Sequence, residues 1–158
     1  MISQPALIVR RLLCIAVLVS AATGCSTQQS ASRSPSASIG DQAVVVALQQ
    51  VGVPYRYGGA TPSGFDCSGL VQYSYSRVGK SVPRTTKALW KNVQPVSRDQ
   101  MRAGDLLFFN IAGKMSHVGM YIGDNRFVHA PSTGKVVSVA SLRSDYYRKA
   151  LIRAGRPE

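Results

Sequence analysis

The sequence has few acidic residues, few cysteines and histidines, and no long apolar run. Only 7 of its 158 residues are Asp or Glu, against 19 Lys or Arg, and it holds three cysteines and two histidines. The apolar run of residues 12–22 is too short for a membrane-spanning helix, which needs roughly 20 residues. Any chemistry that uses thiols or imidazoles must therefore depend on very few positions.

The excess of Lys and Arg over Asp and Glu favours a partner of negative charge. The formal net charge is +12, which suits cell-wall peptide carboxylates, anionic lipid head groups or nucleic acid. The basic residues are scattered singly and are not interleaved with aromatic residues, so nucleic acid is not expected as a partner.

The N-terminus has the pattern of an export signal. Two arginines precede the apolar run of residues 12–22, and Gly24-Cys25 follows it. The pattern resembles a bacterial lipoprotein signal, which implies that residues 1–24 are removed and that Cys25 carries lipid. Ser26, next in the chain, implies sorting to the periplasmic face of the outer membrane. The alternative is ordinary cleavage that leaves Cys25 unmodified.

The rest of the chain divides into a tether and one domain. Residues 25–38 are rich in Ser, Ala and Gln and are predicted to form a flexible tether, so the globular domain would span residues 39–158. A first helix is predicted with Asp41 as its N-cap and Gly52 at its end, and with an inward face of Val44, Ala47, Leu48 and Val51.

Strand signals dominate the second half of the sequence. A short helix is expected in residues 84–91, and strands are expected in residues 105–109, 117–122, 126–130, 136–140 and 147–153. Helices followed by a series of antiparallel strands indicate an α+β domain with helices packed on an antiparallel sheet.

One cysteine lies at the start of a predicted helix. Asp66 is a good N-cap, and the helix after it would end at Gly79 and bury Leu70, Val71, Ser74, Tyr75 and Val78. Cys67 would then sit in the first turn, where free N–H groups and the helix dipole favour a thiolate. The alternative is a buried, inert cysteine.

Both histidines lie on a predicted β-hairpin. If residues 123–125 all form the turn, His129 lies opposite Gly119, and both His117 and His129 lie on the same face. A two-residue turn would place the histidines on opposite faces.

These residue types suit a thiol hydrolase. One imidazole would accept the thiol proton of Cys67, and a second polar group would orient that imidazole. A zinc site of Cys67, two histidines and a water is an alternative, but the spacings match no structural zinc pattern, so no metal is expected. A Cys25–Cys67 disulfide, which would silence the site, is a further alternative. Tyr55 could donate its hydroxyl to a developing oxyanion beside the Cys67 N–H.

Several motifs occur together in a characteristic order. They are Val53-Pro54-Tyr55-Arg56-Tyr57-Gly58-Gly59, Phe65-Asp66-Cys67-Ser68-Gly69-Leu70-Val71, Pro83-Arg84-Thr85-Thr86, Ala103-Gly104-Asp105-Leu106-Leu107-Phe108-Phe109, Ser116-His117-Val118-Gly119-Met120-Tyr121-Ile122-Gly123 and Phe127-Val128-His129-Ala130-Pro131. This series resembles the NlpC/P60 family of papain-like bacterial cell-wall cysteine peptidases. The resemblance covers about residues 39–156. Leu89 departs from it, because the family often has Gln at that position.

The resemblance implies a role for each site residue. Cys67 would be the nucleophile, His117 the general base and His129 the residue that orients it, while Tyr55 would help to form the oxyanion hole. Asp66 and Ser68 would lie beside the stem-peptide end of the substrate.

The implied reaction is hydrolysis of an amide in peptidoglycan stem peptides or cross-links, with no cofactor. The alternatives are a lipid-anchored wall-binding or scaffold protein without activity, and a thiol acyltransferase on the same fold.

Overall fold

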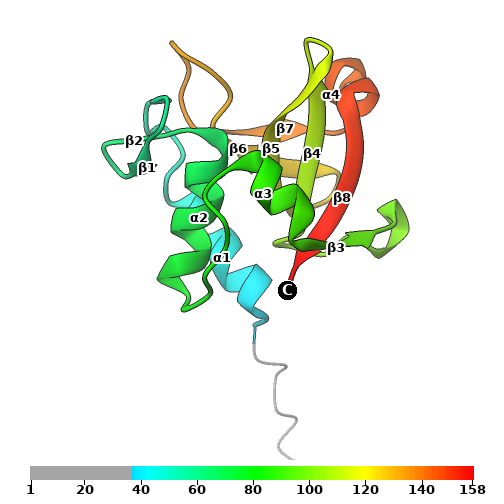
Figure 1. The fold of residues 1–158 in the computed structure, drawn as a ribbon, viewed down its shortest axis with the longest axis horizontal. Helices are drawn as coiled ribbons and strands as arrows, with labels where there is room; N and C mark the ends of the chain where they lie inside the picture. The colour runs from blue at the N-terminus through cyan, green and yellow to red at the C-terminus, as the bar shows by residue number, and fades with distance from the viewer. Residues whose placement is uncertain (1–36) are drawn as a thin grey trace, which may run out of the picture. The chain divides into compact units, whose positions relative to one another are not determined.

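The described part of the molecule is an α+β domain. The computed structural model describes residues 37–158 (Figure 1). The predicted signal peptide, Cys25 and almost all of the tether lie outside these residues. No helix within the described range is long and apolar enough to cross a membrane.

Four α-helices, a 3₁₀ helix and eight strands make up the domain. The helices are α1 (Ile39–Leu48), α2 (Cys67–Arg77), α3 (Thr86–Lys91), η1 (Arg98–Gln100) and α4 (Asp145–Ala150). Strands β1 (Ala60–Thr61) and β2 (Gly64–Phe65) form a small hairpin. The main-sheet strands are β3 (Val93–Val96), β4 (Leu106–Ile111), β5 (Lys114–Gly123), β6 (Arg126–His129), β7 (Ser138–Ser141) and β8 (Leu151–Pro157).

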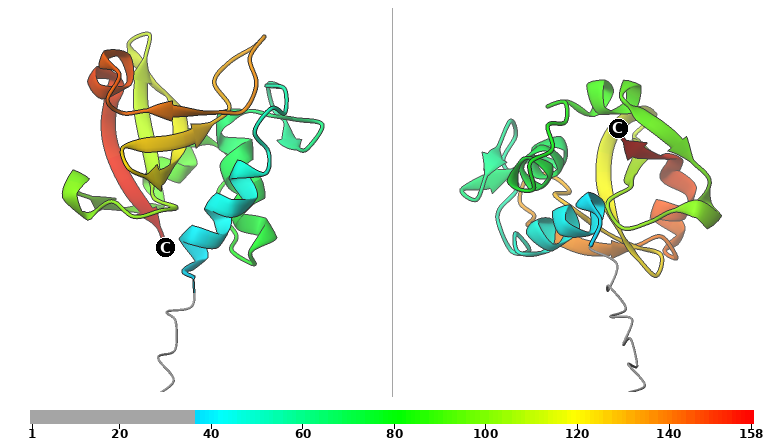
Figure 2. Two further views of the ribbon diagram at one scale, coloured as in Figure 1. Left: turned by 180° about the vertical axis from the view of Figure 1, so that it is seen from behind. Right: turned by 90° about the horizontal axis from the view of Figure 1, so that it is seen from below.

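The six-stranded sheet has helices on both faces. Its order is β3-β8-β4-β5-β6-β7, and every pairing is antiparallel. Alternate residues of β4 enter two different cores: Phe108 packs with the side of α1, α2 and α3, and Phe109 packs with the side of α4. Figures 1 and 2 show α1 and α2 side by side next to the sheet. The expected architecture is confirmed.

Helix α1 differs in detail from the prediction. Its N-cap is Ser38, which forms a capping box with Asp41, so Asp41 is the third helical residue and not the cap. The buried positions are Ala43, Val44 and Ala47, whereas the predicted Leu48 and Val51 are exposed. Gly40 shares the buried face and approaches the backbone of Gly104 so closely that a side chain would not fit. The predicted inward face was right for Val44 and Ala47 and wrong for Leu48 and Val51, because the helix packs closely through its small residues Gly40, Ala43 and Ala47.

The hairpin of the two histidines has the predicted register but not the predicted turn. Only Asp124 and Asn125 form the turn, with φ of 51° and 55°, and Gly123 pairs with Arg126. A β-bulge at Ile122 then inserts one extra residue. The predicted three-residue turn is therefore wrong, but the bulge restores the offset that puts both histidines on the same face.

Two further segments depart from the prediction. Residues 147–153 were expected to be a strand, but residues up to Ala150 belong to α4, whose Ser144 cap accepts a hydrogen bond from the Tyr147 N–H. The cap and the basic residues of the last turn favour a helix over the strand preference of tyrosine. Strand β3 was not predicted, and its Pro95 is tolerated because β3 is an edge strand.

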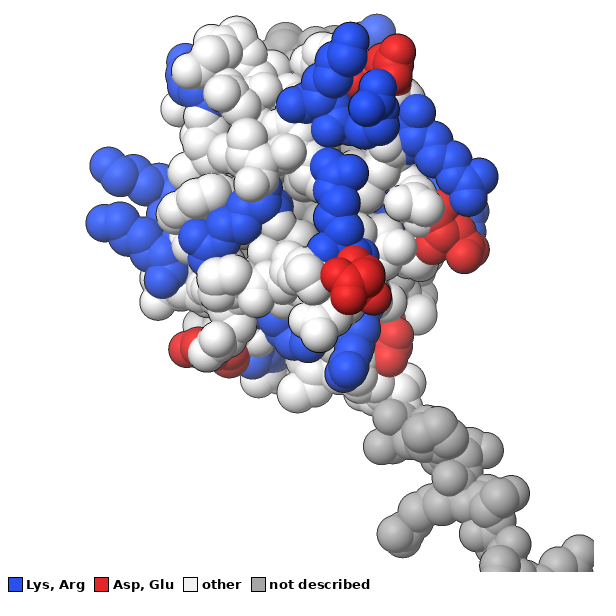
Figure 3. All heavy atoms as spheres, turned by 90° about the vertical axis from the view of Figure 1, so that its right-hand side faces the viewer, with Lys and Arg blue, Asp and Glu red and all other residues white. Residues whose placement is uncertain are grey.

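Charge is spread over the surface. Figure 3 shows one face, on which Lys and Arg side chains are dispersed among neutral residues and outnumber the acidic ones. This agrees with the scattered pattern seen in the sequence.

Candidate active site

The thiol of Cys67 lies where the sequence predicts it. Cys67 is the first residue of α2, and Asp66 caps the helix by accepting a hydrogen bond of 2.7 Å from the Gly69 N–H. The helix ends in a Schellman arrangement at Gly79, which has a φ of +80°. Its predicted inward face, from Leu70 to Tyr75, is buried. The periodicity and the cap residue thus predicted this element correctly.

The thiol contacts polar groups from two other elements. Its Sγ lies 3.7 Å from Thr86 Oγ1, at the start of α3, and 3.9 Å from the carbonyl oxygen of Ser116 on β5. Within residues 37–158 no hydrogen bond joins Sγ to His117. The thiol is half-buried and is not part of a disulfide in the described structure.

The two histidines form a hydrogen-bonded pair. His117 Nε2 lies 2.8 Å from His129 Nδ1, and the rings meet edge to face. Burial lowers the pKa of His117 to about 4. Burial, and then the neighbouring His117, lower the pKa of His129 to about 3. Both imidazoles are therefore neutral at pH 7.

Aromatic rings shield the histidine pair from water. Phe127 lies 4.9 Å from His129 between ring centroids, and Tyr147 lies 5.4 Å from His129. Phe109 lies 5.8 Å from His117. Sequence reasoning did not find Tyr147, because it comes from α4, which was predicted as a strand.

Tyr55 is held beside the thiol. Its N–H donates a hydrogen bond of 2.8 Å to the carbonyl oxygen of Lys135, and its backbone pairs with Phe65 just before the Cys67 helix. Burial raises the pKa of the Tyr55 hydroxyl, and the charges of Cys67 and Asp66 raise it further. The hydroxyl therefore stays protonated and is able to donate a hydrogen bond.

A single cavity brings the predicted residues together. It has a volume of about 480 Å³, and its wall includes Tyr55, Cys67, Ser116, His117 and His129. The thiol, both imidazoles and the Tyr55 side chain thus line one cavity, although they come from four segments of the chain. Asp66 and Ser68 are not part of this wall.

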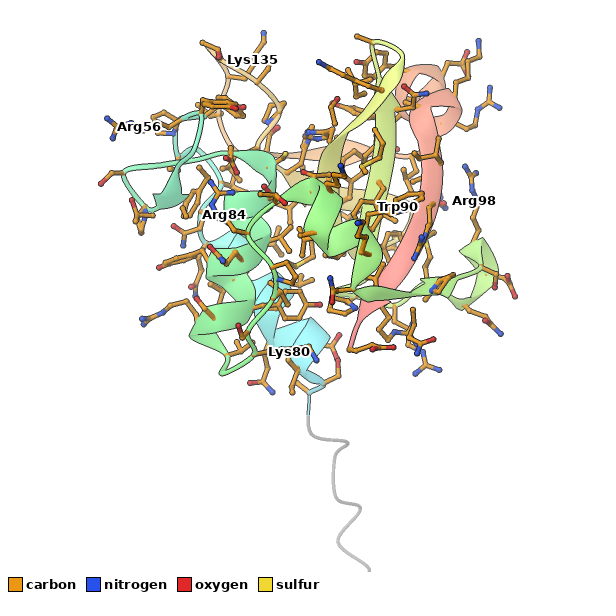
Figure 4. All side chains as sticks on the ribbon, viewed as in Figure 1. Arg56, Lys80, Arg84, Trp90, Arg98 and Lys135 are labelled. Atoms are coloured by element: carbon orange, nitrogen blue, oxygen red, sulfur yellow. The ribbon has the colours of Figure 1, made fainter. Side chains whose placement is uncertain are left out.

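Asp66 and Ser68 instead join a network that Arg84 completes. Arg84 donates to both Asp66 carboxylate oxygens at 2.7 and 2.9 Å, and to Ser68 Oγ at 3.0 Å. Burial alone would raise the Asp66 pKa, but the hydrogen bonds from Arg84, Gly69 and Gly58 outweigh it and lower that pKa. In Figure 4, Arg84 lies next to the upper end of α2. Its part in the site was missed, because no local pattern pairs it with a residue 18 positions away.

The described residues contain no candidate metal centre. Within residues 37–158 no group of three or more His, Cys, Asp or Glu side chains is placed to hold an ion. Cys25, the possible disulfide partner of Cys67, lies outside these residues.

The sequence profile of the NlpC/P60 family matches residues 52–156, and thus about two thirds of the chain, including every residue of the cavity named above. The chain belongs to the NlpC/P60 family. Its predicted fold class and membership are thereby confirmed.

Two curated relatives from Escherichia coli K12 are murein peptidases by name. Murein DD-endopeptidase MepH is 40% identical over 115 residues, which cover 69% of this chain and 42% of that protein. Murein DD-endopeptidase MepS/Murein LD-carboxypeptidase is 42% identical over 106 residues, which cover 66% of this chain and 56% of that protein. The match therefore spans only about half of each relative.

Solved structures share the fold. The NlpC/P60 domain of the peptidoglycan hydrolase SagA superposes with a TM-score of 0.65 at 36% identity, over 73% of this chain and 97% of that one. An NLP/P60 family protein similar to lipoprotein, from Staphylococcus aureus, gives a TM-score of 0.68 at 38% identity, over 75% of this chain and 41% of that one.

Proposed function

We propose that this protein is a cysteine peptidase that hydrolyses amide bonds in the stem peptides or cross-links of peptidoglycan. The observation that carries the proposal is the cavity that Cys67 at a helix N-terminus shares with the His117–His129 pair and Tyr55. The murein endopeptidase names of the relatives and the peptidoglycan hydrolase name of a structural neighbour support peptidoglycan as the substrate.

The histidine pair suits base catalysis in one tautomeric arrangement. If His117 donates its Nε2–H to His129 Nδ1, the lone pair on His117 Nδ1 is free to accept the Cys67 proton. His129 then holds the ring of the base in place and stabilises the charge that His117 gains. Because both imidazoles are neutral at pH 7, His117 is able to act as a base there.

The thiol and the base are not hydrogen-bonded in the resting structure. Sγ has Thr86 Oγ1 and the Ser116 carbonyl oxygen as its partners, and we propose that bound substrate brings Sγ into a hydrogen bond with His117. Catalytic hydrogen bonds are often long in unliganded enzymes and shorten when substrate binds.

The reaction then proceeds through an acyl-enzyme. His117 takes the thiol proton, and Sγ attacks the scissile carbonyl carbon. The Cys67 N–H and the Tyr55 hydroxyl donate hydrogen bonds to the oxyanion. Collapse of the intermediate breaks the C–N bond, and His117 gives its proton to the leaving amine. Water, deprotonated by His117, next hydrolyses the thioester and regenerates the thiol.

Asp66 and Ser68 are proposed to lie beside the stem-peptide end of the substrate, as the family resemblance implies. Their hydrogen bonds to Arg84 mean that the three residues would act there as one unit.

The place of action is proposed from the N-terminal signal. Lipid on Cys25 would hold the mature protein on the periplasmic face of the outer membrane. A tether of about 14 residues reaches roughly 20 Å as a flexible coil. The enzyme would thus act on wall close to its membrane, and its basic surface would favour that anionic polymer.

The test is digestion of purified wall. The mature protein with Cys25→Ser is incubated with sacculi and with soluble muropeptides, and the products are identified by mass spectrometry. We expect this protein to release products of amide cleavage. The same protein that also carries Cys67→Ala should release none. Products of equal yield from the Cys67→Ala protein would refute the thiol mechanism, and binding of sacculi without cleavage would favour the scaffold alternative.

A further inference from the structure

The cavity of the site is lined by positive charge and by no negative charge. Thirteen residues line it, and Lys135 is the only one with a charged side chain at pH 7, because both histidines are neutral. No Asp or Glu lines it. A substrate group of negative charge would thus meet one cation there and no repelling carboxylate.

The backbone of Lys135 is fixed relative to the site. Lys135 belongs to the loop of residues 130–137, which joins β6 to β7. Its carbonyl oxygen accepts a hydrogen bond from the Tyr55 N–H at 2.8 Å. Val137, two residues on, accepts one from the Gly52 N–H at 2.9 Å and donates one to the Val53 carbonyl oxygen at 2.8 Å. The Cα of Lys135 therefore cannot drift away from Tyr55, whereas its flexible four-carbon stem leaves the ammonium free to move.

The ammonium of Lys135 is available to a ligand. Within residues 37–158 it forms no ion pair and no side-chain hydrogen bond. Figure 4 places Lys135 on the outer loop at the same end of the molecule as Arg56, whereas Lys80 lies at the opposite end. The wall of the same cavity is polar and apolar in similar parts, and Ile111, Ala140 and Tyr147 supply apolar groups. The cavity thus combines a wall of mixed polarity with one cation.

We propose that Lys135 is a specificity residue that binds a free carboxylate of the substrate beside the scissile amide. This inference rests on the proposed peptidase function and names the substrate class: peptides in which a residue flanking the cleaved bond carries an unmodified carboxylate. Amidation of that carboxylate would remove the charge that Lys135 binds.

Two synthetic stem peptides test the inference. They differ only in whether the carboxyl group flanking the scissile amide is free or amidated. We expect a kcat/KM about two- to fivefold higher for the free acid, mostly through KM, because an exposed ion pair contributes modestly. The preference should fall as ionic strength rises.

Variants of Lys135 test whether its positive charge causes the preference for the free acid. Lys135→Met should bring the ratio of the two kcat/KM values close to one, Lys135→Glu should invert it, and Lys135→Arg should keep it. Lys80→Met is the matched control and should leave the ratio unchanged. Equal rates for both peptides with the wild-type protein, or a preference that survives in Lys135→Met, would overturn the inference.

A binding experiment distinguishes failure of this inference from failure of the proposed function. The dissociation constants of both peptides are measured by calorimetry with Cys67→Ala, with and without Lys135→Met. If the wild-type protein cleaves neither peptide, the peptidase proposal fails, and tighter binding of the free acid that depends on Lys135 would still uphold its role. Binding of both peptides with equal affinity would refute that role.

Discussion

The carboxylate of Asp66 caps the helix that begins with Cys67 and at the same time accepts two hydrogen bonds from Arg84. One side chain thus fixes the orientation of α2 and ties to it the segment that leads into α3. Thr86, which contacts the thiol, lies only two residues after Arg84. The position of the thiol among its neighbours therefore depends on this ion pair.

We expect Asp66→Ala to lower the free energy of unfolding by about 2–3 kcal/mol, because it removes a helix cap and leaves a part-buried guanidinium without its partner. Urea denaturation measures the change. Arg126→Ala is the control, because its pair with Asp124 is exposed, and it should have little effect. If Asp66→Ala and Arg84→Ala had strictly additive effects in the double variant, the two side chains would not be coupled as the structure indicates.

Gly69→Ala should also destabilise the protein. A Cβ at this position would overlap the carbonyl oxygen of Gly59, which accepts hydrogen bonds from the Asp66 N–H and from Arg84. We expect a loss of about 1–3 kcal/mol by urea denaturation, as for other overpacked sites. In an open helix the same change stabilises by up to about 1 kcal/mol, so a gain would show that the loop does not lie this close.

The histidine pair predicts how stability depends on pH. Because the folded-state pKa values of about 4 and about 3 lie below the ordinary value of 6.5, the unfolded chain binds protons first as the pH falls. Stability is then complete above pH 6.5 and decreases as the pH falls towards 4. Between pH 7.5 and pH 5.5 we expect a loss of about 3 kcal/mol in chemical denaturation, from two histidines at about 1.4 kcal/mol each.

The cause of this loss can be checked directly. The chain has only two histidines, so proton uptake in this range is assigned to His117 and His129. Imidazole NMR signals of the folded protein should not titrate between pH 5.5 and 8. A titration midpoint near 6.5 for either ring would mean that the pair is hydrated and not buried.

His129→Ala should reduce peptidase activity less than Cys67→Ala does. Its loss leaves the nucleophile and the base in place but removes the group that orients His117, so we expect kcat to fall by about 10²–10³-fold. Initial rates on a soluble muropeptide measure it, and circular dichroism controls for folding. Activity as low as that of Cys67→Ala would instead indicate a shared catalytic role or a role as a metal ligand for His129.

Cys25→Ser should release the mature protein from the membrane. We expect the wild-type protein in the membrane fraction, with a mass increase on Cys25, and the variant in the soluble periplasmic fraction. Wild-type protein recovered from the periplasm with an unmodified Cys25 would contradict lipid anchoring.

Local patterns predicted the parts of the site that depend on neighbours in the chain. The cap at Asp66, the period of α2 and the alternation on the histidine strands were sufficient to place Cys67, His117 and His129. The Arg84 contact could not be predicted in this way, because it depends on how two distant segments pack. The same holds for β3, which is a strand only because β8 pairs with it. Helix α1 was predicted in the right place, but spacing alone did not show which face comes close to the rest of the domain, so Leu48 and Val51 were wrongly placed inside.

The sheet order has a consequence for export. Strand β8, the last element, lies between β3 and β4, so the sheet that carries the histidine strands is incomplete until residues 151–157 arrive. A chain that crosses a membrane from its N-terminus delivers these residues last. Under the proposed export, the precursor could not close its sheet during transit, and the proposed hydrolytic activity would begin only after the whole chain had reached the compartment that contains the wall.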